Sequence, residues 1–201
     1  MRRVIAFLLI GEALVGIVAW TVLALLDDVP HFVWDVPTLG WSLLATLTLG
    51  MANWAVFHSL RKASSGVRFL EPVRRLLEDE LFPMLSSIGP LQIVLLAALA
   101  GVGEELFFRG LLQPRIGLVL ASVAFGVVHG PQWDLWPLAL WATVMGWILG
   151  LMYVYSNSLT LPILVHAGYD ALALAYIRYG VRGNGVDGPG EDLREVIPDS
   201  Q

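Results

Sequence analysis

Ionisable side chains recur in the apolar second half of the chain, where the sequence reads ALAGVGEELFFRGLLQ, then SVAFGVVHG, then LPILVHAGYD. Glutamate and histidine are the side chains that proteins most often use to transfer protons. Two histidines with a carboxylate can also bind a catalytic zinc ion. The residues that could do such chemistry are Glu104, Glu105, Arg109, His129, His166 and Asp170.

These residues lie in stretches that are otherwise apolar enough for a membrane. A charge at the centre of a membrane helix costs about 2.5–3.5 kcal/mol, so an ionisable residue there marks a functional site by default. Each residue alone has a structural interpretation: Glu105 and Arg109 could staple two helices, and His129 or His166 could hydrogen-bond a neighbouring helix. Two histidines and a spare glutamate exceed that structural need, so the set is interpreted as a functional site.

Helical spacing indicates which of these side chains share a face. Glu105 and Arg109 are four residues apart and can therefore pair. Glu104 lies about 100° around the helix from Glu105, so it can point into a different space. The same spacing of four residues also relates Phe125 to His129 and His166 to Asp170.

The depth of these residues follows from the rise of a helix. If the helices that carry Glu104 and His129 form a hairpin near Pro114, the two residues lie roughly 15 Å and 22 Å from the turn. His166 lies roughly 10 Å inside a helix that starts near Leu159. All three residues are therefore expected near the middle of the bilayer, where they can meet.

Composition predicts the class of protein that positions them. Apolar residues make up 57% of the 201 residues, charged residues make up 14%, and the mean hydropathy is +0.71. A soluble domain has about 25% charged residues. A chain with so few charges is therefore expected to expose its surface to lipid and not to water. Cysteine is absent, which excludes disulfides, thiolate metal sites and a cysteine nucleophile. The sequence contains no cluster of basic residues of the kind that would predict nucleic-acid binding.

About six transmembrane helices are expected, and with one interfacial helix they give an all-α polytopic membrane bundle. The predicted spans are 4–26, 39–59, 89–112, 116–130, 136–155 and 159–177. The first is interpreted as a retained span, because it runs to Leu26 and ends in Asp27-Asp28 without a cleavage site. Glu12 within it either snorkels or faces another helix.

The distribution of lysine and arginine predicts the orientation. With six spans, ten of these residues fall on one side and only Arg109 and Arg115 on the other, and Arg115 alone argues against the assignment. Both termini are thus expected in the cytoplasm of a multi-pass protein of the cell membrane. The ten residues are Arg2, Arg3, Arg61, Lys62, Arg68, Arg74, Arg75, Arg178, Arg182 and Arg194.

Three regions are predicted along the chain. Residues 1–87 hold two spans and a cytoplasmic amphipathic linker, residues 88–179 form a four-helix catalytic core, and residues 180–201 form a disordered polar tail. The apolar face of the linker consists of Phe69, Val73, Leu76, Leu77, Phe82 and Leu85.

Three motifs on successive helices resemble those of the CAAX prenyl protease and bacteriocin-processing family of intramembrane endopeptidases. They read Glu104-Glu105-Leu-Phe-Phe-Arg109, Phe125-Gly-Val-Val-His129 and His166-Ala-Gly-Tyr-Asp170. The resemblance covers roughly residues 90–175. The last motif ends in aspartate, whereas the members that process prenylated proteins have asparagine.

The resemblance implies hydrolysis of a peptide bond in a membrane-associated peptide or protein. Glu104 would then be the general base, and His129 would hold the same water. His166 and Asp170 would stabilise the oxyanion, with Asp170 acting through His166 or in its protonated form. The supporting residues would be Arg109, which fixes Glu105 and the helix geometry, and Phe125.

A metal-dependent mechanism is the rival chemistry. Glu104 or Glu105 with His129 and His166 would supply a zinc ion with two histidines and a carboxylate, leaving one position for water. A mechanism without a cofactor is favoured, because the sequence has no His-Glu-x-x-His pair.

Two other functions remain open at the level of sequence. One is a non-catalytic scaffold or an immunity-type protein that keeps the site as a peptide-binding pocket. The other is an ion or proton transporter, which the absence of repeated broken-helix halves disfavours.

Overall fold

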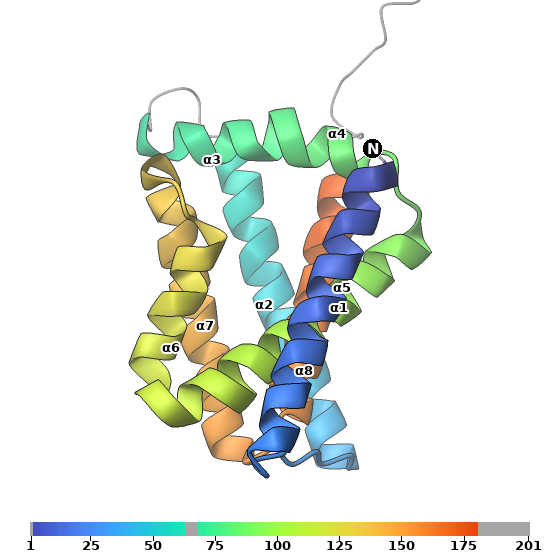
Figure 1. Cartoon of the computed structure of the whole chain (residues 1–201). Helices are drawn as coiled ribbons and strands as arrows, with labels where there is room; N and C mark the ends of the chain where they lie inside the picture. Colours follow the sequence, from blue (N-terminus) through green and yellow to red (C-terminus); the bar gives the residue numbers. More distant parts are fainter. Residues whose placement is uncertain (1, 63–67, 181–201) are drawn as a thin grey trace, which may run out of the picture.

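The computed structural model describes residues 2–62 and 68–180, and every regular element in these ranges is helical (Figure 1). The predicted all-α membrane bundle is therefore confirmed. The elements are α1 (Arg2–Leu25), α2 (Val36–Lys62), η1 (Arg68–Leu70), α3 (Glu71–Arg75), η2 (Leu76–Leu81), α4 (Phe82–Leu85), α5 (Pro90–Glu105), η3 (Leu106–Leu112), α6 (Gln113–His129), η4 (Trp133–Leu135), α7 (Trp136–Ser156), α8 (Thr160–Ala175) and η5 (Tyr176–Gly180).

Within the described ranges, five helices are long and apolar enough to cross a membrane. Their lipid-facing surfaces are apolar: Phe7 is 74% exposed, Leu43 63% and Val119 65%. The five are Arg3–Leu25, Val36–Ser59, Pro90–His129, Trp133–Ser156 and Thr160–Tyr179.

The predicted third and fourth spans lie within the single helical stretch Pro90–His129. This stretch bends back at Gly117, whose φ of 84° and ψ of 163° are not helical. The expected turn at Pro114 is therefore displaced by three residues. Proline fits the first turn of a helix, whereas glycine adopts a positive φ without a steric penalty. In Figure 1, α6 runs back from this bend alongside α7.

Glycines bring the helices that carry the motifs into close contact. A Cβ on Gly101 of α5 would lie 2.9 Å from the backbone nitrogen of Ala167 in α8. A Cβ on Gly126 of α6 would overlap Thr143 Oγ1 and the carbonyl oxygen of Ala139 in α7. Small residues let membrane helices approach in this way. These glycines therefore allow the close contact between α5 and α8 and between α6 and α7.

The segment from η1 to α4 lies across one end of the bundle (Figure 1). Val73 packs against Leu135 there, and Leu85 packs against Ile5 and Ile177. These contacts agree with the predicted amphipathic face, although Phe69 is exposed and stacks on Trp136 instead. They also bring the beginning of α1 and the end of η5 to the same end of the bundle.

The predicted disordered tail falls almost entirely outside the described residues, since the structure describes the chain only to residue 180. Arg182 and Arg194, which contributed to the orientation argument, also lie outside that range.

Candidate active site

A buried ion network lies next to the cavity that Glu104 borders, and Glu105 is at its centre. One carboxylate oxygen, Oε1, accepts a hydrogen bond from Arg109 Nη1 at 2.7 Å and one from His166 Nδ1 at 2.7 Å. The side chains are almost fully enclosed, with exposed fractions of 0% for Glu105 and 2% for both partners. The predicted Glu105–Arg109 pair is present, and it extends to α8 through His166.

Arg109 is held by groups from several elements. Its Nη2 donates a hydrogen bond to the carbonyl oxygen of Gly146 in α7 at 2.9 Å. Its guanidinium carbon lies 4.6 Å from the centre of the Phe125 ring, where a cation–π contact is favourable. Arg109 lies in η3, a π-helical segment that begins directly after Glu105. The guanidinium of Arg109 therefore has a structural role and is buried between helices.

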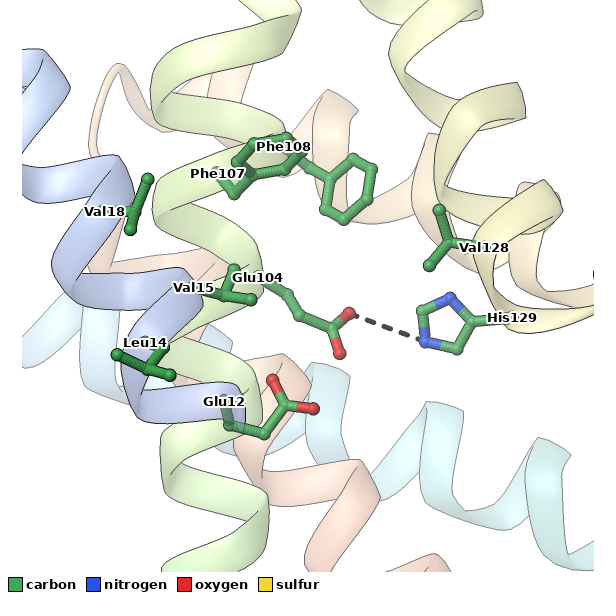
Figure 2. Close-up of a pocket in the computed structure, with 9 residues that line it drawn as sticks. All are labelled: Glu12, Leu14, Val15, Val18, Glu104, Phe107, Phe108, Val128 and His129. Atoms are coloured by element: carbon green, nitrogen blue, oxygen red, sulfur yellow. Dashed lines mark ion pairs between the residues drawn. The ribbon is translucent and has the colours of Figure 1, made fainter. Parts of the chain in front are cut away.

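Glu104 and His129 form the other part of the site. His129 Nδ1 lies 2.8 Å from the carbonyl oxygen of Phe125. A carbonyl oxygen only accepts hydrogen bonds, so Nδ1 carries the proton and, in the neutral ring, Nε2 carries a lone pair. Nε2 lies 3.5 Å from Glu104 Oε2 (Figure 2). Two acceptors face each other at this distance, an arrangement that a shared proton, or a water molecule bonded to both from the side of the cavity, would satisfy.

Glu104 borders a cavity of about 550 Å³ between α1, the α5–η3 helix and α6. Figure 2 shows the Glu104 and His129 side chains pointing toward each other across it. Oε2 of Glu104 is buried and has no hydrogen-bond partner among the described residues. Apolar side chains supply the rest of the lining: Leu14, Val15, Val18, Phe107, Phe108 and Val128.

Glu12 also lines this cavity, although the sequence did not predict it as a site residue. Its carboxylate lies beside that of Glu104 in Figure 2. The sequence showed only that this glutamate lies inside an apolar span, which left two interpretations of its side chain open. The structure supports the second interpretation, in which Glu12 faces other helices and does not snorkel.

Asp170 lies near His166 but is less closely bound than Glu105. Its Oδ2 is 3.6 Å from His166 Nε2, beyond hydrogen-bonding distance, and its side chain is 30% exposed. The ring of Tyr169 stacks on that of His166 at 5.3 Å between centres. The structure thus brings the six predicted polar residues into one region, with Glu104 and His129 on the cavity and Glu105, Arg109 and His166 beneath it.

The predicted zinc set does not come together. Within residues 2–62 and 68–180, no three histidine, aspartate or glutamate side chains converge closely enough to hold a metal ion. The reason lies in His166, because its Nδ1 is bonded to Glu105 and its Nε2 faces Asp170, so neither nitrogen is directed at the Glu104–His129 pair.

Comparison with known proteins finds a family that resembles this part of the chain. Residues 86–172 match the family described as type II CAAX prenyl endopeptidase Rce1-like. This segment holds all three motifs, and the resemblance predicted from them is confirmed. Over α5 to α8 the chain is therefore similar to a CAAX-type endopeptidase family.

A relative in Bacillus subtilis (strain 168), the uncharacterized protein YpbD, is 37% identical over 87 residues. The match covers 43% of this chain and 46% of that protein, so the chain spans less than half the length of this curated relative. No solved structure matches the chain.

Proposed function

We propose that this protein is an intramembrane endopeptidase that hydrolyses a peptide bond of a membrane-associated peptide or protein. The observation that carries the proposal is the Glu104–His129 pair, whose facing acceptor atoms lie 3.5 Å apart at the edge of an apolar cavity. In this proposal residues 88–179 are the catalytic core, and residues 1–87 supply two spans and the amphipathic linker.

The first step is the activation of a water molecule that enters from the cavity and hydrogen-bonds to both Glu104 and His129. Glu104 removes a proton from the water, while the lone pair of His129 Nε2 accepts its other hydrogen. The water oxygen then bonds to the carbonyl carbon of the substrate, and the carbonyl oxygen becomes an oxyanion. When the bond between carbon and nitrogen breaks, the proton on Glu104 passes to the leaving amine.

His166 is the candidate stabiliser of the oxyanion. Its ring has carboxyl groups near both nitrogens, Glu105 at Nδ1 and Asp170 near Nε2. Nε2 makes no hydrogen bond to Asp170, which is 3.6 Å away, so a proton on Nε2 is available to an oxyanion that forms next to it. Glu105 and Arg109 act as positioning residues, because both are buried beneath the cavity and outside its lining.

The proposal is tested by cleavage of a peptide library with the detergent-purified protein. Wild type is expected to give specific products, and Glu104→Gln and His129→Ala are each expected to lose at least about 100-fold in rate, as for the loss of a general base. Equal cleavage by all three proteins would identify a contaminating enzyme. Retained binding of peptide by every variant without any cleavage would favour a peptide-binding scaffold instead.

A further inference from the structure

A second carboxylate reaches the cavity from outside the matched family segment. Glu12 belongs to α1, whereas the family match begins at residue 86. It lines the same cavity as Glu104 and His129, and Figure 2 shows its carboxylate directed into their shared space. Among the residues that the structure describes, none forms an ion pair with Glu12 or donates a hydrogen bond to its side chain.

Among the described residues, the lining of this cavity contains no lysine or arginine to pair with its carboxyl groups. Its lining contains two carboxylates, one histidine and otherwise apolar side chains. Arg109 is nearby, but the residue is only 1% exposed and its guanidinium is bonded to Glu105 and Gly146. It is therefore not available to form an ion pair with Glu12. A carboxylate among apolar groups is costly unless it is paired. The occupant that best suits this cavity therefore brings a positive charge.

The backbone holds Glu12 and Glu104 at a fixed separation. A Cβ on Gly103 would lie 2.7 Å from the carbonyl oxygen of Glu12, and a Cβ on Gly16 would lie 3.2 Å from Gly103 Cα. Helices α1 and α5 are thus in direct backbone contact one residue before Glu104. A substrate bound against Glu12 would be held in a constant position relative to Glu104.

We propose that Glu12 is a specificity-determining residue that binds a cationic group of the substrate beside the bond that is cleaved. The group is a lysine or arginine side chain or a free N-terminal amine, all of which pair with a carboxylate in the same way. This inference rests on the proposed endopeptidase function and names the substrate class for its cavity.

The test compares apolar peptides that differ only at one scanned position, which is lysine, glutamine or glutamate. Wild type is expected to prefer the lysine peptide over the glutamate peptide by at least about tenfold in kcat/KM, because opposite charges attract and like charges repel in an apolar site. Glu12→Gln should bring that ratio close to one, and Glu12→Lys should reverse it. The matched control is Glu80→Gln, which removes an exposed carboxylate from η2 and should keep the wild-type ratio.

A uniform loss of kcat/KM for all three peptides in Glu12→Gln would overturn the inference, since it would indicate a structural role. Acetylation of the N-terminus separates the two sources of charge: it abolishes the preference only if the free amine is the group recognised.

A binding measurement separates this inference from the proposed function. Lysine-peptide affinity is compared between Glu104→Gln and the double variant Glu104→Gln/Glu12→Gln. If wild type cleaves nothing but affinity falls at least about tenfold in the double variant, the endopeptidase proposal fails and the role of Glu12 stands. Equal affinities refute the role of Glu12, whatever the cleavage result.

Discussion

A single carboxylate oxygen connects three of the helices that form the candidate site. Glu105 Oε1 accepts hydrogen bonds from Arg109 in η3 and His166 in α8, and Arg109 in turn reaches the Gly146 carbonyl in α7. None of these three side chains lines the cavity. Their contribution is to fix the orientation of the imidazole and of the α5–η3 helix.

The first prediction at this scale concerns the buried cation. Arg109→Met removes the charge and keeps the volume, and it should destabilise the protein by about 3–5 kcal/mol because the buried Glu105 loses its partner. Thermal unfolding in one detergent measures the change. The control is Arg115→Met, which breaks the exposed 3.0 Å pair with Asp28 and should cost less than about 1 kcal/mol. Equal losses would contradict the assigned role of the network.

The second prediction concerns the choice between the two mechanisms. Because His166 is bonded to Glu105 and faces Asp170, the Glu104–His129 pair has no third metal ligand within residues 2–62 and 68–180. Peptide cleavage is therefore expected to survive treatment with a chelator and removal of metal from the purified protein. Activity that returns only on addition of zinc would reject the glutamate mechanism.

The helix pair α6–α7 positions His129, and Gly126 controls how closely the two helices approach. Gly126→Ala should force α6 away from α7, because the new methyl group would overlap Thr143 and the carbonyl of Ala139. A destabilisation of about 1–3 kcal/mol is expected from this overpacking, together with loss of peptide cleavage. The measurements are thermal unfolding and kcat/KM.

Gly40→Ala is the matched control for this prediction. A Cβ on Gly40 would meet nothing within 4 Å, so the substitution should leave both stability and cleavage close to wild type. Full activity of Gly126→Ala would show that the contact between α6 and α7 does not set the position of His129.

Sequence spacing predicted the contacts within helices better than those between them. The pairing of Glu105 with Arg109 followed from their separation of four residues, and it is present. The same spacing suggested that Asp170 orients His166, yet Glu105 on another helix lies closer to that ring, at 2.7 Å against 3.6 Å. Contacts across helices depend on how α5 and α8 dock, which spacing along one helix does not encode.

The membrane class of the whole molecule followed from composition, whereas its boundaries did not. Low charge and long apolar stretches were sufficient to predict an all-α bundle. The bend between the third and fourth spans occurs at Gly117, not at Pro114, because proline fits the first turn of α6 while glycine adopts the positive φ that the bend requires. Glu12 was missed as a site residue because its neighbours come from α5 and α6.

The topology of the whole chain gives the last prediction. We propose that the amphipathic segment η1–α4 and both ends of the chain lie on the cytoplasmic side. The chain has no cysteine, so single-cysteine variants report accessibility without background. In sealed inside-out vesicles, Glu80→Cys should react with a membrane-impermeant maleimide, and Asp28→Cys should react only after the vesicles are opened. The reverse pattern would invert the orientation.

The bond between Glu105 and His166 also has a consequence for biosynthesis. The two residues are separated by 61 positions, and His166 belongs to the last described membrane helix. A nascent chain that has inserted only as far as α7 holds Glu105 and Arg109 in the bilayer without the imidazole that orients them. The proposed hydrolytic centre is complete only when α8 has entered the membrane, so a chain that ends before α8 is expected to lack peptide cleavage.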